Sequence, residues 1–388
     1  MSAAPVQEPV TRRLLAGIRA DGRPLSLAEH RRLHGSVDVD GRTLVELVDR
    51  SGLRGRGGGG FPTGRKLAAV RASGRRAVVV VNGAEGEPPA GKDKVLLAYQ
   101  PHLVLDGAVA AAHAVRAREV VVAVNRVVLA AVERAIAERD DPKVTLRAVA
   151  VPDRFVAGEE TALVQFLNGG PALPTFTPPR PFERGVRGLP TLVQNAETLA
   201  QLALIARRGP EWFRSVGDPE HPGTVLVTLS GSVREAGVYE IATGYPLSAL
   251  LADAGGTSGE PQAFLVGGYF GTWIPGTAVD VPLANGGLQA YGATLGAGAV
   301  RVLPRGTSGI AETARILRYL ADESAGQCGP CVYGLAAVAD DFAGLASRDR
   351  HVDRDRLERR LGAIAGRGAC RHPDGAVRLA ASALRVFA

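Results

Sequence analysis

The chain has 388 residues, of which 46% are hydrophobic and 22% charged, values typical of a globular protein that can bury a sizeable core. The formal net charge is +7, but the basic residues are mostly arginines spread along the chain, which argues against a nucleic-acid-binding protein. Its 49 glycines are clustered in loops rather than periodic, which excludes a collagen-like or low-complexity chain.

The N-terminal segment Met1 to Arg23 lacks the apolar stretch of a secretory signal, so we expect no signal peptide. Every apolar stretch of about 18 residues is interrupted by charges or glycines, and the sequence therefore predicts no transmembrane segment. Peripheral attachment to a membrane stays open.

The first predicted elements surround a loop rich in glycine. Residues 1–40 are predicted as a polar arm with a short helix, and Thr43 to Arg50 as a helix with Thr43 as its cap. The glycine loop follows, and a second helix is expected from Lys66 to Ala72.

Buried strands and helices then alternate. Continuous apolar, β-branched runs are typical of strands covered on both faces. The predicted strands are 76–81, 119–124 and 144–151, and the predicted helices are 92–117, 126–139 and 159–167. This alternation predicts a doubly wound, parallel α/β domain.

The C-terminal half changes character twice. An extended, proline-rich loop over 173–190 is long enough to suggest a site. Residues 224–256 then read as a hairpin and a helix, a small α+β module, with short strands and glycine turns up to about 304. From Ala311 onward the pattern is helical, which predicts a small bundle. The expected helices are 311–323, 331–346, 354–365 and 374–386.

The fold class predicted from these patterns is α/β, with a Rossmann-like parallel sheet, then a small α+β domain, then a C-terminal helical bundle. The expected segments are the arm 1–41, the α/β domain 42–222, the α+β domain 223–304 and the bundle 305–388.

The glycine loop carries the spacing G-x-G-x-x-G at Gly55, Gly57 and Gly60. Glycine lets the backbone approach a phosphate, and a following helix N-terminus favours negative charge. Lys66 adds a cation within reach. The loop follows a helix rather than a strand, so a tight turn without a ligand is the alternative.

Two acidic segments are further candidates. The first, Asn82 to Pro88, directly follows a predicted strand, where ligands bind in parallel sheets. Its Asn and carboxylates could hydrogen-bond a ribityl chain, a ribose or an isoalloxazine edge; a solvated acidic turn is the alternative. The second, Gly158 to Ala162, opens a helix, where acids are also ordinary N-terminal chemistry.

The three cysteines are Cys328, Cys331 and Cys370. An odd count with one C-x-x-C pair argues against a disulfide framework and, in a cytoplasmic chain, indicates metal, cluster or redox use. Zinc would need a fourth ligand, for which His372 is near in sequence, and an iron–sulfur cluster would usually need four thiolates. Unligated thiols are the alternative.

Together these segments resemble the NADH-oxidising flavoprotein subunit of respiratory complex I and its relatives in soluble hydrogenases and formate dehydrogenases. The resemblance covers roughly residues 42–386. The stretches that carry it are SGLRGRGGGGFPTGRK, NGAEGEPPAGKDK, AGEETALVQFLNGG, LPTLVQNAETL, the segment around Gly231 to Gly256, ESAGQCGPC and Cys370. The middle segment resembles the soluble-ligand-binding β-grasp domain.

The resemblance implies an NADH dehydrogenase-like enzyme subunit with FMN, an iron–sulfur cluster, NAD(H) as substrate and other redox subunits as partners. The implied catalytic residues are Glu87 and Glu160. The implied cofactor-binding residues, FMN and NADH taken together, are Gly55, Gly57, Gly58, Gly60, Phe61, Lys66, Asn82, Glu85, Gly158, Glu159, Gln194 and Asn195. The implied cluster ligands are Cys328, Cys331 and Cys370.

The chain departs from the family pattern in four places. Ala325 replaces the first cysteine of C-x-x-C-x-x-C, which leaves a 3Fe–4S cluster, a 4Fe–4S cluster with another ligand, or none. The other ligands considered are Ser324, Asp322 and His372. Ala84 replaces an Asp, and aromatics that stack on adenine are missing at Ala69 and within Thr177 to Arg180.

Three hypotheses follow from the sequence. The first is an FMN and iron–sulfur subunit that oxidises NADH. The second is an FMN protein without an NADH site, which a protein partner supplies with electrons. The third is a scaffold that kept the fold and lost the redox chemistry.

Overall fold

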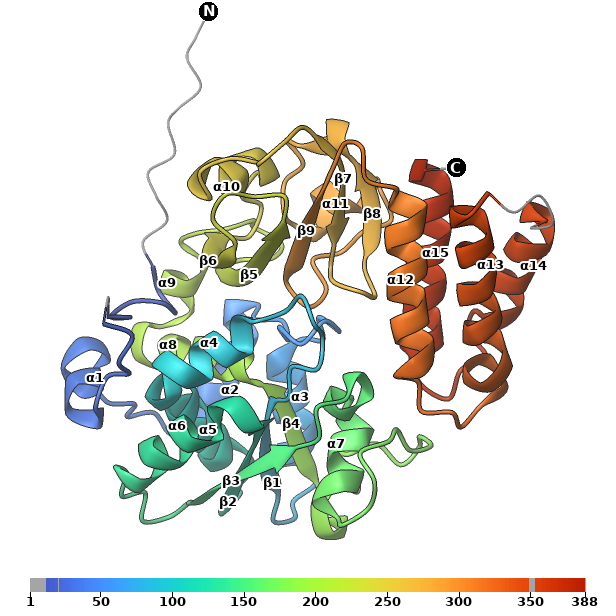
Figure 1. Cartoon of the computed structure of the whole chain (residues 1–388). Coiled ribbons are helices and arrows are strands. Elements are labelled where there is room, and N and C mark those ends of the chain that lie inside the picture. The colour runs from blue at the N-terminus through green and yellow to red at the C-terminus, as the bar shows by residue number, and fades with distance from the viewer. Residues whose placement is uncertain (1–11, 20, 349–352, 388) are drawn as a thin grey trace, which may run out of the picture.

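A computed structural model describes residues 12–19, 21–348 and 353–387; the first eleven residues of the predicted arm lie outside this part. Figure 1 shows three layers of structure: an α/β part, a second sheet above it, and a helical bundle against the side of that sheet. The fold class predicted from the sequence is confirmed. The predicted domain boundaries stay a proposal.

The α/β part holds a four-stranded parallel sheet in the order β3-β2-β1-β4. Its strands are β1 (Val78–Gly83), β2 (Glu119–Asn125), β3 (Thr145–Val151) and β4 (Thr191–Asn195). Its helices are α2 (Gly41–Ser51), α3 (Thr63–Ala72), α4 (Lys92–Tyr99), α5 (Pro101–Val115), α6 (Arg126–Ala137), α7 (Glu160–Leu167), α8 (Ala196–Arg208) and α9 (Pro210–Arg214).

The two faces of this sheet pack into separate cores. Alternate valines of β1, such as Val79 and Val81, face a large core with α2 to α6 and α8, whereas Val78 and Val80 face α7. Because side chains alternate along a strand, a run of four valines covers both faces, and this is why the run was readable as a buried strand.

Two local predictions were wrong, and one strand was missed. The expected helix 92–117 is two helices bent by 95°, since Pro101 lacks the N–H that would continue the first helix. The cap of α2 is Asp40 rather than Thr43: its carboxylate accepts the N–H of Arg42 at 2.9 Å and that of Thr43 at 3.2 Å. The strand β4 was not predicted, because its five residues give too short a pattern.

The second sheet is mixed, in the order β6-β5-β9-β7-β8. Its strands are β5 (Thr224–Gly231), β6 (Gly237–Ala242), β7 (Pro261–Val266), β8 (Thr272–Pro275) and β9 (Ala299–Pro304), with helices α10 (Leu247–Asp253) and α11 (Asn285–Gln289). The antiparallel pair β5-β6 followed by α10 confirms the predicted hairpin and helix.

The C-terminal bundle packs on the β7-β8 side of this sheet (Figure 1). It consists of α12 (Gly309–Asp322), a π-helical turn over Pro330–Leu335, α13 (Ala336–Ala346), α14 (Arg354–Ile364) and α15 (His372–Phe387). Trp273 of β8 anchors it: the indole N–H donates to Thr313 Oγ1 at 3.0 Å, and the backbone N–H donates to Ser382 Oγ at 2.9 Å. The predicted helical bundle is confirmed.

In the part of the chain that the structure describes, no single helix is long and apolar enough to cross a membrane. The helices α4 and α5 pass that test only as a pair, and they are bent at Pro101.

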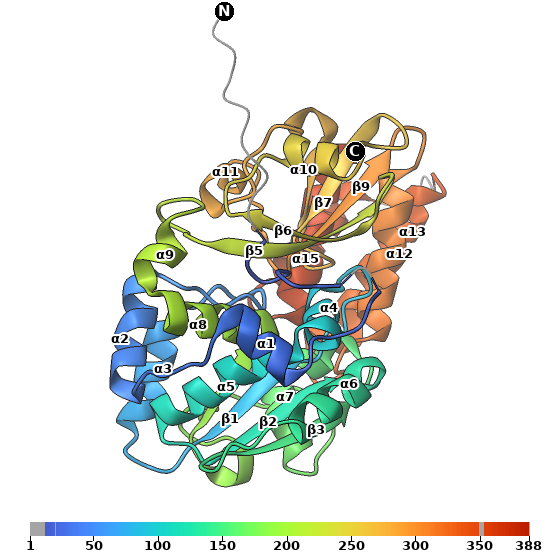
Figure 2. The same cartoon turned by 90° about the vertical axis from the view of Figure 1, so that its left-hand side faces the viewer.

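The N-terminal helix α1 (Leu27–His34) lies across α5 (Figure 2) and buries a cluster of histidines. The ring of His30 lies 4.9 Å from that of His34 and 5.6 Å from that of His102, measured between centroids. His30 Nε2 lies 2.7 Å from Asp106 Oδ2, and Arg207 also bonds this carboxylate. The cluster therefore fixes the arm to the α/β part.

Acid is expected to weaken this attachment. Burial, with the nearby charge of His30 and Arg207, lowers the pKa of His34 to about 4, and burial lowers the pKa of His102. Since both folded pKa values lie below the unfolded value of 6.5, the unfolded chain binds more protons and stability falls as the pH drops from about 6.5 to 4.

Replacing His34 by glutamine should reduce this loss by on the order of 1 kcal/mol, because partial exposure screens the charges. The measurement is urea denaturation at pH 7 and pH 4. His113→Gln, at an exposed position of α5, is the matched control. An acid slope that is the same in His34→Gln and the wild type would contradict the prediction.

Candidate functional site

Most of the predicted site residues gather at the carboxyl ends of β1 and β4. Asn82 and Asn195 pair in register on these adjacent strands. The chain order of the sheet reverses here, since β1 has β2 on one side and β4 on the other. Ligands bind in parallel sheets at such a crevice.

The glycine loop folds back on itself above this edge. The N–H of Gly55 donates to the carbonyl of Phe61 at 2.9 Å, and that of Thr63 donates to Leu53 at 2.9 Å, which closes the loop. Gly58 and Gly60 have φ values of 98° and 59°, in the region that glycine tolerates best. Because glycine has no side chain, a ligand can approach the backbone of these residues closely.

Open space lies on one side of this loop. A Cβ atom added to Gly59 or Gly60 would meet no other atom within 4 Å, whereas one on Gly57 would lie 3.3 Å from Asn195 Cβ. Lys66, in the first turn of α3, lies beside the loop, and its Nζ is 3.1 Å from Glu160 Oε1. A bare loop, a helix N-terminus and a lysine fit a phosphate group.

The resemblance implies that this loop holds the phosphate of FMN, so replacing Gly57 by valine should weaken FMN binding at least about tenfold, which corresponds to about 1.4 kcal/mol. The added side chain would meet Asn195 and stiffen the loop. Flavin fluorescence titration measures the Kd. Gly362→Ala, where an added Cβ meets no other atom within 4 Å, is the control, and an unchanged Kd in Gly57→Val would refute the loop assignment.

The segment after β1 is held by contacts from three directions. Asn82 Nδ2 donates to the carbonyl of Gly158 at 2.8 Å, and the N–H of Glu85 donates to Asn125 Oδ1 at 2.8 Å. Glu85 is buried, and its carboxylate accepts the N–H of Lys94 at 3.2 Å. Burial, together with the charge of Asp93, raises the pKa of Glu85 to about 7.

Glu87 lies where the α/β part meets the second sheet. Its Oε1 accepts the N–H of Tyr269, and a Cβ atom on Gly268 would overlap this carboxyl. The side chain as a whole is half-buried, but its carboxyl is closely surrounded, and burial raises the pKa of Glu87 to about 8. The raised pKa favours the protonated form of Glu87 at neutral pH.

The remaining predicted residues lie at the same edge of the sheet, which we call the rim: the carboxyl ends of β1 and β4 with the loops that follow them. Glu159 caps α7, with its Oε2 accepting the N–H of Thr161 at 2.9 Å and that of Ala162 at 3.0 Å. Gln194 of β4 is buried, and its Nε2 has no partner among the described residues. An unsatisfied buried amide is costly, so Gln194 fits a position that a ligand completes.

Three charged residues behind Asn195 were missed from the sequence. Lys92 is buried and pairs with Asp93 at 2.9 Å and with Glu197 at 3.0 Å. Asn195 Nδ2 donates to Asp93 Oδ2 at 2.6 Å, and its Oδ1 accepts the N–H of Glu197 at 3.0 Å. These pairs hold the Asn195 side chain in place. The sequence gives no signal of a buried charge, because a buried Lys or Asp is the same letter as an exposed one.

The aromatic groups expected for a dinucleotide are only partly present. Phe61 is 55% exposed beside the glycine loop, and Phe176 of the proline loop is 80% exposed. Ala69 and Arg180 are also exposed, where the resemblance implies stacking aromatics. Two free phenylalanine rings are therefore available to a planar ligand.

The three cysteines lie together at one end of the bundle. Burial and the neighbouring Cys328 and Cys370 raise the pKa of Cys331 to about 12, a mutual effect that requires proximity. Burial acts to raise the pKa of Cys328, but the backbone N–H groups of Ala369 and Cys331 outweigh it and lower that pKa. All three are free thiols.

The backbone also supplies N–H groups to the other two sulfurs, from Gly326 to Cys331 and from His372 to Cys370. Such N–H groups stabilise sulfur that carries negative charge, as in iron–sulfur sites. Among the described residues, no three His, Cys, Asp or Glu side chains converge on a single metal ion. A cluster differs, because its thiolates bind separate irons. The arrangement fits a cluster held by these three thiolates.

The cysteine segments contact the loop that leads to the edge formed by β1 and β4. The N–H of Phe155 donates to Glu323 Oε2 at 2.9 Å, and Arg154 donates to the carbonyl of Ser324 at 3.3 Å. The Phe155 ring is 5.5 Å from that of His372, which packs at the start of α15. The loop that leads to Glu159 therefore touches both segments that carry the cysteines.

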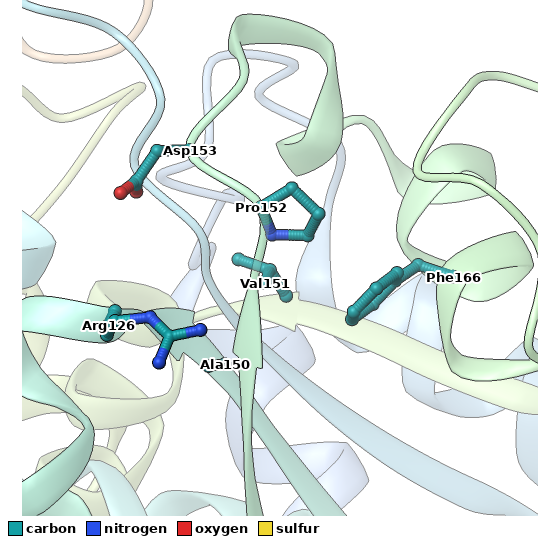
Figure 3. A pocket seen from close by; sticks show the side chains of 6 residues that line it. All are labelled: Arg126, Ala150, Val151, Pro152, Asp153 and Phe166. Carbon is teal, nitrogen blue, oxygen red and sulfur yellow. The ribbon is translucent and has the colours of Figure 1, made fainter.

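A separate cavity of about 370 Å³ lies outside this rim, beyond the end of β3 (Figure 3). Arg126, Asp153 and Phe166 surround it. Asp153 already accepts a hydrogen bond from Asn125 at 2.7 Å, so the cavity adds no group to the predicted site.

Comparison with known proteins agrees with this geometry. Residues 48–204 match the family model of the Nuo51 FMN-binding domain, and residues 311–388 match the iron–sulfur binding region of NADH-ubiquinone oxidoreductase F. The two matched ranges contain the predicted cofactor-binding residues and the three cysteines.

The similar proteins cover most of the chain. The F 2 subunit of NADH-quinone oxidoreductase from Rhizobium meliloti is 33% identical over 89% of this chain and 86% of its own length. The corresponding F subunit from Streptomyces coelicolor is 34% identical, over 89% and 81%. A crystal structure of an NAD+-reducing NiFe hydrogenase matches with a TM-score of 0.83 and 32% identity, and the match spans 61% of that hydrogenase chain and 90% of this one. The chain therefore belongs to the family of the F subunits of NADH-quinone oxidoreductase.

Proposed function

We propose that the chain is the NADH-oxidising flavoprotein subunit of a multi-subunit oxidoreductase. The observation that carries this proposal is the closeness of two family regions, since the Phe155 loop of the FMN-binding region touches the cysteine-bearing segments. When bound, FMN accepts a hydride and gives up single electrons, and an iron–sulfur cluster carries them onward.

The flavin is held by the rim at β1 and β4. The backbone of Gly55 to Gly60 and the Lys66 ammonium bind the phosphate, which the open side of the loop supports. Asn82, Glu85, Gly158, Glu159, Gln194 and Asn195 contact the rest of the flavin. Because Lys92 and Asp93 fix Asn195, its amide is oriented before the flavin arrives.

NADH approaches over the glycine loop. The exposed ring of Phe61 offers a face for stacking, and Glu160 lies beside Lys66 at the same opening. Glu87 presents a neutral carboxyl at neutral pH, which avoids repulsion of the dinucleotide phosphates. This assignment makes Glu87 and Glu160 the residues that position the nicotinamide end.

The partners are other redox subunits that accept the electrons. A formal charge of +7 suits an acidic partner surface or an anionic membrane surface. We place the protein in the cytoplasm, because three free cysteines and a thiolate-held cluster suit a reducing compartment.

An anaerobic ultraviolet–visible spectrum before and after NADH tests the proposal, with iron and flavin counted on the same sample. We expect flavin bands that bleach with NADH, together with broad iron–sulfur absorbance. Flavin bands that do not change on addition of NADH would favour the second hypothesis, an FMN protein that receives its electrons from a protein partner. A chain that takes up neither flavin nor iron on reconstitution would refute the proposal.

A further inference from the structure

The chain has three cysteines in total, whereas a 4Fe–4S cluster usually has four thiolates. The family pattern that the chain resembles, C-x-x-C-x-x-C, has its first cysteine at the position of Ala325, ahead of Cys328 and Cys331. A methyl group therefore stands where the resemblance implies a sulfur.

The three cysteines and Ala325 differ in their surroundings. Each of the three sulfurs receives at least one backbone N–H, from Ala369 and Cys331, from Gly326, or from His372. Ala325 offers no donor atom to an iron, and the two residues that follow it, Gly326 and Gln327, are exposed. Ala325 and this exposed loop thus supply no fourth thiolate to a cluster.

The polar side chains considered as a fourth ligand, and their neighbour Glu323, differ in their contacts. Glu323 accepts the N–H of Phe155, and Asp322 is exposed at the end of α12. His372 Nε2 lies 2.6 Å from the carbonyl of Leu320, and its ring packs against Phe155 and Phe270. Within the described part of the chain, His372 Nδ1 is buried without a partner, which leaves this nitrogen as the competing ligand to be tested.

We propose that the cluster of this chain is a four-iron cluster held by Cys328, Cys331 and Cys370, in which one iron has no protein thiolate and exchanges with solvent. This inference rests on the proposed function. A one-electron oxidant such as ferricyanide removes one electron from the 4Fe–4S cluster in its 2+ state, and one Fe2+ leaves as its bonds to three sulfides break. A 3Fe–4S cluster in its 1+ state remains, and the three bonds to Cys328, Cys331 and Cys370 stay intact.

The experiment compares the full chain with Ala325→Cys, each loaded anaerobically with iron and sulfide and then given one equivalent of ferricyanide. The wild type should lose about one iron in four and gain the electron paramagnetic resonance signal of an oxidised three-iron cluster. Ferrous iron with dithionite should restore the lost iron. Ala325→Cys should keep all of its iron and show no such signal.

Ala311→Cys, which adds an exposed thiol at the far end of α12, is the matched control and should behave as the wild type. The inference would be overturned if the wild type retained all of its iron after ferricyanide. It would also be overturned if Ala325→Cys lost as much iron as the wild type. A wild type that retains its iron until His372→Asn releases it would overturn the inference too, since His372 would then be a fourth ligand. Absence of iron from both chains while NADH still bleaches the flavin would overturn both the inference and the cluster part of the proposed function; absence of bleaching alone would not affect the inference.

Discussion

Replacing Lys92 by methionine is expected to lower the free energy of unfolding by about 3–5 kcal/mol. Lys92 is buried between Asp93 and Glu197, and burial alone would lower its pKa, but these two carboxylates raise it above its usual value. Methionine fills a similar volume and removes the charge, so two buried carboxylates lose their partner. Removing one member of a buried ion pair is costly for this reason.

Urea denaturation at neutral pH measures this effect. The control is Lys143→Met, at an exposed position between α6 and β3, which should change stability by less than about 0.5 kcal/mol. The Lys92 variant should also bind FMN more weakly, since Asn195 would lose a neighbour that holds its amide. An unfolding midpoint equal to that of the wild type would show that Lys92 does not neutralise the pair.

Replacing Cys331 by alanine is expected to abolish the iron–sulfur cluster while leaving the flavin in place. Cys331 is the most buried of the three cysteines, at 5% exposure, and both Cys328 and Cys370 are close enough to raise the pKa of its thiol. Its loss would leave two thiolates. Each thiolate binds one iron, so too few irons would be anchored to keep the cluster in the protein. The expected result is loss of nearly all iron and of the broad visible absorbance, with flavin bands that still bleach with NADH.

Tyr333→Ala is the matched control, because Tyr333 lies in the same π-helical turn but is 77% exposed. It should keep its iron. Equal iron content in Cys331→Ala and the wild type would show that these thiols bind no cluster. Loss of both flavin and iron would instead indicate that the bundle has come apart, which circular dichroism would detect.

Phe155 lies at the contact between the α/β part and the segments that carry the cysteines. Phe155 donates its N–H to Glu323 and packs on His372, so the loop that ends at Glu159 is fixed to the cysteine segments. Cys370 also lies close enough to Glu159 for that carboxylate, after burial itself, to contribute to raising the pKa of the thiol. The proposed flavin site and the cysteines are therefore neighbours, as electron transfer between two bound groups would require.

The sequence by itself determined the local features of this protein. The run of four valines predicted β1, since side chains alternate and both faces must be apolar. The clustered glycines predicted a loop with open backbone, and the spacing of Cys328 and Cys331 predicted their common site. Each of these signals lies within about ten residues, where periodicity and turn chemistry act.

Only the tertiary structure decided which distant residues meet. Lys92 finds Glu197 and Gly57 finds Asn195 across more than a hundred residues, because β4 returns beside β1. Cys370 reaches the rim because α15 packs on the second sheet. Burial, and with it the raised pKa of Glu87, also arises only on folding. Such contacts depend on the packing of whole layers, which no short stretch of sequence specifies.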